Sequence, residues 1–113
     1  MNSVIMIGDS VASASIHGNV SITGATGEVF LDEVIIGGNL QISDSNGFQI
    51  TVTFSNVAGN ALFQNNTLTT SPFIISGNVI GGNLMCSGND PAPENQSKQN
   101  TVAGRKSGQC SAL

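Results

Sequence analysis

The chain has 113 residues, with seven Asp and Glu against three Lys and Arg and a formal net charge of −4. This length fits one domain, and so few basic residues exclude the positive surface that binding to nucleic acid requires. No apolar run approaches the roughly 20 residues that span a bilayer, so no membrane-spanning segment is predicted.

A glycine followed by a polar residue recurs along the chain at a nearly constant interval. The five copies are Gly18-Asn19, Gly38-Asn39, Gly59-Asn60, Gly82-Asn83 and Gly104-Arg105. The steps between their glycines are 20, 21, 23 and 22 residues, too short for helical repeats but suited to one coil of a parallel β-solenoid. We therefore predict one all-β solenoid domain over residues 1–113, with about 4–5 coils of ~20–23 residues each. The alternative, in which Gly-Asn marks the turns of an antiparallel sandwich, fits the interval less well.

Residues 1–16 are predicted to form a partial N-terminal coil, with Val11 and Ile16 in positions that later coils fill with inward residues. The apolar run at residues 4–7 lacks a polar cap, and an uncovered solenoid end recruits other strands. The run therefore fits a partial coil, the cut edge of a longer solenoid, or a surface for another subunit. Residues 1–10 have neither the basic flank nor the small-residue cleavage site of a signal peptide.

Residues 17–86 are predicted to form the full coils. Apolar residues recur at fixed offsets from each Gly-Asn unit, and alternate residues of a strand face opposite sides. The predicted inward residues near this unit are Ile16, Ile36, Val57, Ile80 and Val102, then Val20, Leu40, Ala61 and Leu84, then Ile22, Ile42, Phe63 and Cys86. A second strand in each coil adds Val29, Leu31, Ile50, Val52, Phe73 and Ile75. The predicted outward residues are Ser21, Gln41, Leu62 and Met85, and turn-rich insertions are predicted at residues 25–27, 44–47 and 65–72.

The glycine of each unit supplies backbone freedom at a tight corner where a Cβ would clash. The asparagines that follow are predicted to form a ladder at this corner, with each side-chain amide pairing with neighbouring coils. The ladder residues are Asn19, Asn39, Asn60 and Asn83. The fifth copy has Arg105 in place of Asn, which predicts that the last coil is incomplete.

Residues 87–113 are predicted to form a C-terminal flap and a partial last coil. Pro91 and Pro93 cannot donate to a strand ladder, so residues 87–100 are predicted to leave the coil and fold over its end. Cys86 lies in an inward column, and Cys110 lies two residues beyond strict register in the last coil. A bridge between them fits adjacent coils, would stabilise by on the order of 3–4 kcal/mol, and would favour an oxidising compartment. Two independent thiols are the alternative.

The C-terminal part also resembles a known family. The segments that carry the likeness are Gly81-Gly82-Asn83-Leu84-Met85-Cys86, Ser87-Gly88-Asn89-Asp90-Pro91-Ala92-Pro93, Asn100-Thr101-Val102 and Gly108-Gln109-Cys110. With them, residues 16–113 resemble uncharacterised secreted bacterial proteins, common in actinobacteria, that are built from GNV/GNL coils. The resemblance implies a right-handed parallel β-helix, secretion, and a Cys86–Cys110 disulfide. This family has no assigned catalytic residues, so none are carried over.

The ionisable residues do not form a catalytic pattern. The carboxylates are scattered at Asp9, Glu28, Asp32, Glu33, Asp44, Asp90 and Glu94. Solenoid enzymes that act on pectin pair such acids with a basic residue, but no Lys or Arg of this chain falls on a neighbouring strand. A calcium site from Glu28, Asp32 and Asp44 is a weak alternative because no ligand spacing recurs. His17 has no adjacent nucleophile, and two Cys with one distant His are poor zinc ligands; no catalytic, cofactor or metal site is predicted.

These observations favour a non-catalytic secreted structural or adhesive module, located outside the cell or at its surface. Binding to an extracellular polysaccharide is one alternative, supported by the polar surface but opposed by the absence of Trp and Tyr. Self-assembly is another, by end-on stacking through the N-terminal coil as in bactofilin-like solenoids.

Overall fold

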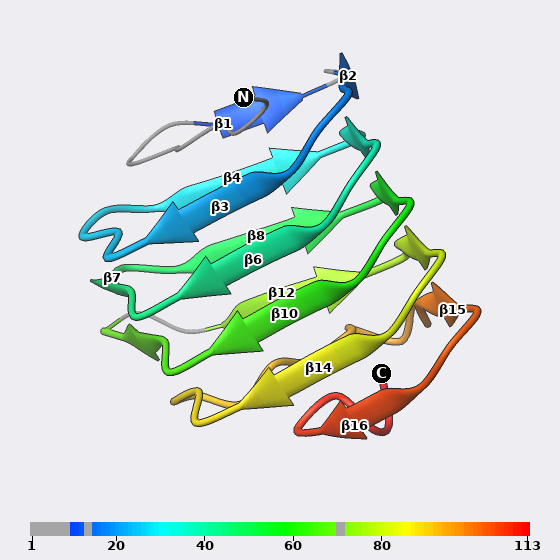
Figure 1. Cartoon of the computed structure of the whole chain (residues 1–113). Helices are drawn as coiled ribbons and strands as arrows, with labels where there is room; N and C mark the ends of the chain where they lie inside the picture. Colours follow the sequence, from blue (N-terminus) through cyan, green and yellow to red (C-terminus); the bar gives the residue numbers. More distant parts are fainter. Residues whose placement is uncertain (1–9, 13–14, 70–71) are drawn as a thin grey trace.

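The computed structural model describes residues 10–12, 15–69 and 72–113. In these residues the chain is all-β, contains no helix, and winds into a right-handed parallel β-helix of about four turns (Figure 1). The predicted fold is therefore confirmed. The apolar run at residues 4–7 and the carboxylate of Asp9 lie outside the described residues.

Each coil contributes one strand to each of several parallel sheets, so strands about one coil apart in sequence lie side by side. Sheet A contains β1 (Ser10–Ala12), β4 (Val29–Asp32), β8 (Ile50–Thr53) and β12 (Phe73–Ser76). Sheet B contains β2 (Ser15–Ile16), β5 (Ile35–Ile36), β9 (Asn56–Val57), β13 (Val79–Ile80) and β15 (Thr101–Val102). Sheet C contains β3 (Val20–Thr23), β6 (Leu40–Ser43), β10 (Ala61–Gln64), β14 (Leu84–Ser87) and β16 (Lys106–Gly108). A small sheet D contains β7 (Asn46–Gly47) and β11 (Thr67–Leu68).

The pairing register matches the repeat in the sequence. In sheet C, for example, Val20, Leu40, Ala61 and Leu84 lie directly over one another. The predicted inward residues between Val20 and Cys86 are all at most 2% exposed, and Ile16 and Val102 near the two ends are half-buried against this core. Among the predicted outward residues Gln41 is exposed, whereas the other three are half-buried.

The core is a set of stacked aliphatic columns with two phenylalanines in its middle. The rings of Phe63 and Phe73 meet edge to face, with their centroids 5.8 Å apart and their planes at 76°. Each large side chain of this kind contributes roughly 1.5–3 kcal/mol when it is fully buried. The columns therefore supply the main driving force that holds successive coils together.

The coil turns sharply after sheet A and again after sheet C, and each turn uses a residue with positive φ. The residues after sheet A are Glu33, Phe54 and Gly77, and those after sheet C are Gly24, Asp44, Asn65 and Gly88; in the last coil it is Gly108, the final residue of β16. Gly, Asn and Asp tolerate this left-handed conformation best. Each turn reverses the alternation of side chains, so the residue that follows it points into the coil. The two strands of sheet D lie in segments 44–47 and 65–72, which the sequence pattern assigned to insertions.

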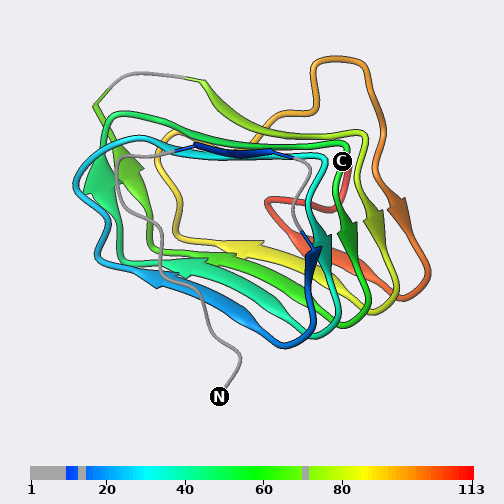
Figure 2. The same ribbon diagram turned by 90° about the horizontal axis from the view of Figure 1, so that it is seen from above.

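One prediction about the C-terminal part is wrong, because residues 87–100 do not fold over the end of the coil. Asp90 bridges Thr67 and Glu94 bridges Ile74, both in parallel. The N–H groups of Asp90 and Glu94 donate to carbonyls of the preceding coil at 2.8 and 2.9 Å. Pro91 lies between these two donors in the sequence, at the edge of the structure, where the missing N–H of a proline costs little. The segment thus continues the coil, and the C-terminal residues turn inward to cover the end instead (Figure 2).

Candidate functional site

The predicted asparagine corner lies on the surface between sheets B and C. There the Oδ1 atoms of Asn19, Asn39, Asn60 and Asn83 each accept the backbone N–H of the residue one coil further on. The first three bonds are 2.8 Å long, and the fourth, from the N–H of Arg105, is 2.9 Å. The contact is thus from side chain to backbone, rather than between two side-chain amides.

The same geometry explains why glycine precedes each asparagine. A Cβ built on Gly38 would collide with Oδ1 of Asn19, and one on Gly59 would collide with Oδ1 of Asn39. Gly82 and Gly104 face the asparagine of the preceding coil in the same way. Each Gly-Asn unit therefore has two roles: its asparagine binds the following coil, and its glycine makes room for the asparagine of the coil before.

Arg105 ends this surface ladder. Its backbone N–H still donates to Asn83, so the last coil is bound as the others are. It precedes β16, which is the edge strand of sheet C. Because the described chain has no further coil at that edge, a side-chain amide at position 105 would have no backbone N–H to accept.

A second ladder lies inside the coil, at the turn that follows sheet C, and sequence analysis missed it. Asn66 accepts the N–H of Ser45 at 3.1 Å, and Asn89 accepts both the N–H and the Nδ2–H of Asn66 at 3.1 and 2.8 Å. Gln109 accepts the same two groups of Asn89, each at 2.9 Å. The Nδ2 groups of Asn66 and Asn89 also donate to carbonyls of Ile42 and Phe63 at 3.0 Å.

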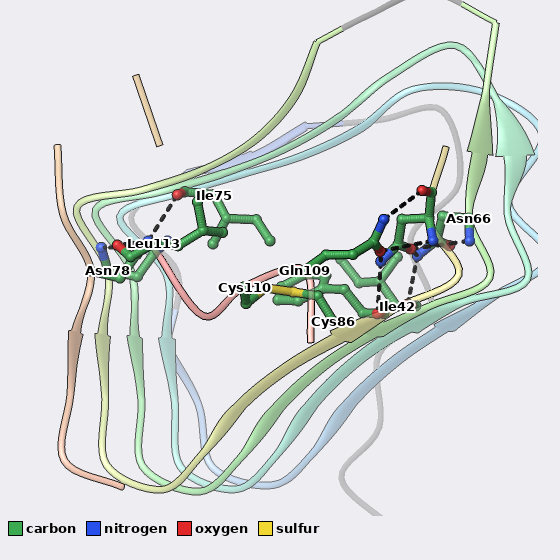
Figure 3. Close-up of a disulfide and its surroundings, with 11 residues drawn as sticks. Ile42, Asn66, Ile75, Asn78, Cys86, Gln109, Cys110 and Leu113 are labelled. Carbon is green, nitrogen blue, oxygen red and sulfur yellow. Dashed lines mark hydrogen bonds between the residues drawn. A yellow bond between two sulfur atoms is a disulfide. The ribbon is translucent and has the colours of Figure 1, made fainter. Parts of the chain in front are cut away.

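A third ladder follows the turn after sheet A and is also buried. The N–H of Val34 donates to Oγ of Ser55, whose own N–H donates to Oδ1 of Asn78 at 2.9 Å. Asn100 accepts the N–H and the Nδ2–H of Asn78 at 3.0 and 2.9 Å. The backbone carbonyl of Leu113 then accepts the N–H of Asn100 at 2.9 Å. Figure 3 shows both internal ladders, one on each side of the disulfide.

Both internal ladders carry a signal that the sequence contains. Ser45, Asn66, Asn89 and Gln109 recur at the interval of the Gly-Asn unit, and so do Ser55, Asn78 and Asn100. The columns begin in the described chain with the buried apolar residues Ala25 and Val34. The ladders therefore become more polar toward the C-terminus, where Asn and Gln replace Ala, Val and Ser.

The disulfide between Cys86 and Cys110 is present, as predicted. The two Cα atoms are 5.3 Å apart, and the side chains are 2% and 0% exposed. Cys86 pairs in register with Gly108, so Cys110 lies two residues further on, inside the turn. Gly108 has φ of 64°, and a Cβ at this position would collide with the carbonyl oxygen of Cys86. This glycine thus allows the chain to turn inward tightly enough for the bridge.

The carboxylates do not gather into a site in the described residues. Asp32 is half-buried and accepts the Oγ1–H of Thr53 at 2.7 Å, while the other described carboxylates are exposed. The described part of the chain has no group of three His, Cys, Asp or Glu that could hold a metal ion. No pocket opens among these residues either. His17 is exposed, next to the first Gly-Asn corner.

Some hydrophobic side chains lie on the surface, which the sequence pattern did not predict. Phe48 is 58% exposed and Phe54 is 49% exposed, and the two flank β8 on the outside of the coil. The ring of Phe54 lies against Gly77 and is covered by the ammonium group of Lys98, 4.9 Å from the ring centroid. Ile35 and Val79 are about half exposed on the outer face of sheet B. Aromatic surface is thus present despite the absence of Trp and Tyr.

Together these features define a right-handed parallel β-helix with three hydrogen-bond ladders and a disulfide-closed C-terminal end. Comparison with protein-family models, with curated proteins and with solved structures gave no match. The likeness to secreted GNV/GNL-coil proteins therefore stays a prediction. Across the described residues, none of the elements is a helix of the length and hydropathy that crossing a membrane requires.

Proposed function

We propose that the protein is a non-catalytic structural or adhesive module that acts outside the cell or at its surface. The observation that carries this proposal is the way in which polar and covalent bonds tie every coil to the next. Ladders run along the surface corner and along two internal turns, and the disulfide fixes the last coil. Among the described residues, only Oγ of Ser45 is a buried side-chain polar atom without a hydrogen-bond partner.

The disulfide supports the extracellular part of the proposal. Disulfides form and persist in oxidising compartments and are rare where glutathione keeps thiols reduced. Both cysteines of the chain are in the bridge, so no free thiol is left. Backbone hydrogen bonds between successive coils also oppose the local unfolding that a protease requires.

The proposal is tested by measuring resistance to proteolysis and mechanical load. The oxidised protein is expected to survive proteinase K under conditions that degrade a globular control of similar size. In single-molecule pulling, the segment between Cys86 and Cys110 is expected not to lengthen until a reductant is added. Rapid digestion of the oxidised protein throughout its coils would contradict the structural role, and release of products from a panel of polysaccharides would contradict the absence of catalysis.

A second candidate function is binding to a polysaccharide, and the exposed ring of Phe48 favours it. Apolar ring faces stack on sugars, and the surrounding Ser, Thr, Asn and Gln can hydrogen-bond hydroxyl groups. A glycan array with and without calcium tests this function. Binding that is lost in Phe48→Ala but kept in Gln41→Ala, an exposed residue on another face, would support it. A blank array would remove it.

End-on stacking receives less support, because the C-terminal end of the solenoid is occupied by the chain itself. The donors of Asn89 and Asn100, which point toward the position of a further coil, are bonded to Gln109 and Leu113. A second copy would have to displace these partners before it could add a coil there. Continued head-to-tail growth is therefore not expected, and the mass in light scattering should not rise beyond that of a dimer as the protein concentration increases.

A further inference from the structure

The last five residues occupy the place that a further coil would take. Cys110 and Leu113 are 0% and 6% exposed, although they follow the final strand β16. In Figure 3, Cys110 lies between the two internal ladders, and Leu113 lies beside the ladder that contains Asn78. We call residues 109–113 the plug.

The plug reproduces the hydrogen bonds of a missing coil in one ladder through a single side chain. Oε1 of Gln109 accepts the two N–H groups of Asn89, as Oδ1 of Asn89 does for Asn66. In earlier coils the carbonyl of the ladder residue accepts a backbone N–H from below, as Asn66 does from Asp90. Asn89 has no such strand below it, and Nε2 of Gln109 donates to its carbonyl at 2.8 Å instead.

In the other ladder, the plug uses its own backbone. The carbonyl of Leu113 accepts the N–H of Asn100 at 2.9 Å and its Nδ2–H at 3.2 Å. Asn100 provides the same two contacts to Asn78 through its side chain. Asn95 adds a third donor to the carbonyl of Leu113, at 3.2 Å.

Apart from these hydrogen bonds, the plug is held by the disulfide and by the burial of Leu113 against the end of the core. The plug follows β16 and belongs to no sheet. Its remaining backbone hydrogen bonds are the bond from the N–H of Gln109 to the carbonyl of Cys86 and short-range bonds within turns. Ordering a short chain end costs conformational entropy that a few hydrogen bonds barely offset. The disulfide removes most of this cost because it keeps Cys110 next to Cys86 when the hydrogen bonds open.

We propose that the Cys86–Cys110 disulfide is a redox-sensitive latch, and that reducing it releases the plug while the preceding coils stay folded. Because both cysteines are buried while the plug is in place, the reaction requires a transient opening of the chain end. One thiolate of a dithiol reductant then attacks a cysteine sulfur and releases the other cysteine, and its second thiolate displaces the remaining cysteine from the mixed disulfide; the reductant supplies two electrons and two protons in all. Cys86 and Cys110 leave as thiols and the reductant as a cyclic disulfide. Release opens the apolar end of the core and the donors of Asn89 and Asn100 to solvent.

Amide hydrogen exchange, read by mass spectrometry or NMR with and without dithiothreitol, tests the latch. On reduction, exchange at the N–H groups of Asn89, Asn100 and Leu113 is expected to become at least tenfold faster. Exchange at Leu40 and Ala61, whose N–H groups bond to the next coil far from the plug, is expected to change less than twofold. Reoxidation should restore the slow exchange.

Two results would overturn the proposal. Unchanged exchange at Asn100 and Leu113, in protein in which both cysteines have been shown to be reduced, would show that the plug stays bound without its latch. Faster exchange at Leu40 and Ala61 as well would show that the disulfide holds the whole fold rather than its end. The oxidised variant Gln109→Ala provides an independent check, because it should expose the N–H of Asn89 while the N–H of Asn100 keeps its bond to Leu113.

Discussion

The pairing of each glycine with the asparagine of the preceding coil predicts a specific coupling between two substitutions. In Gly59→Ala the new Cβ collides with Oδ1 of Asn39, and the carbonyl oxygen of Gly38 lies 3.0 Å away. Gly59 has no positive φ, so its backbone conformation accepts alanine. The collision can be relieved only if the side chain of Asn39 rotates away, which breaks its 2.8 Å bond to the N–H of Asn60.

The magnitudes follow from these contacts. Gly59→Ala adds a methyl group to a filled space, and such overpacking costs about 1–3 kcal/mol. Asn39→Ala removes one hydrogen bond at an exposed corner, which costs roughly 0.5–1.5 kcal/mol. In the double variant the collision is gone, because alanine at position 39 has no Oδ1. The double variant should therefore cost less than the sum of the singles, by about 1 kcal/mol or more.

Urea unfolding of the four proteins, monitored by circular dichroism, measures this coupling free energy. The matched control pairs Gly59→Ala with Asn19→Ala, because Asn19 contacts Gly38 and not Gly59. The two positions lie two coils apart, about 10 Å, so their effects should add within about 0.5 kcal/mol. If the Asn39 and Gly59 substitutions are also additive, the Gly-Asn repeat does not owe its glycine to the asparagine of the preceding coil.

Three further predictions concern the interior. Asn78→Ala should lower the free energy of unfolding by about 3 kcal/mol in urea titrations, because it leaves the buried N–H of Ser55 and the carbonyl of Val52 without these partners. A loss of stability no greater than that caused by replacing an exposed corner asparagine would contradict the buried ladder. Phe63→Ala should cost about 3–5 kcal/mol by the same measurement, since its ring is 1% exposed, and a loss under about 1 kcal/mol would contradict the assigned core. Replacing Cys86 and Cys110 with Ser should cost about 3–4 kcal/mol, and equal stability of the variant and the oxidised wild type would refute the structural role of the bridge.

The parts of this fold that sequence analysis predicted correctly all depend on strict periodicity. A buried column needs an apolar residue in every coil, so residues such as Leu40 and Leu84 repeat with the Gly-Asn unit and can be recognised without coordinates. The disulfide follows from this periodicity only in part, because Cys86 occupies one of these columns whereas Cys110 lies two residues beyond its register. The physical basis is that stacked parallel strands place equivalent residues next to each other.

The internal ladders could not be predicted as readily, because their residues look like ordinary turn residues. Asn66 and Asn89 each follow a residue with positive φ, in segments rich in Gly, Asn, Ser and Thr. In a sequence such residues usually indicate an exposed loop. Their burial depends on the left-handed residue before them, which turns the next side chain inward. Pro91 and Pro93 led to the wrong prediction for residues 87–100 for a related reason. Proline is excluded from a strand only where the hydrogen-bond ladder needs the N–H that proline lacks.

The choice of Gln at position 109 illustrates how the chain closes a repeating structure. An asparagine in this column normally donates through Nδ2 to a carbonyl of an earlier coil, as Asn89 does to Phe63. At the last turn the carbonyl of Cys86 is already bonded to the backbone N–H of Gln109. The carbonyl of Asn89, in contrast, has lost the strand that would have donated to it. Glutamine is one methylene longer than asparagine, so its amide can reach back to satisfy that carbonyl while it accepts both N–H groups of Asn89. At this turn, one side chain thus replaces both the ladder residue and the next strand.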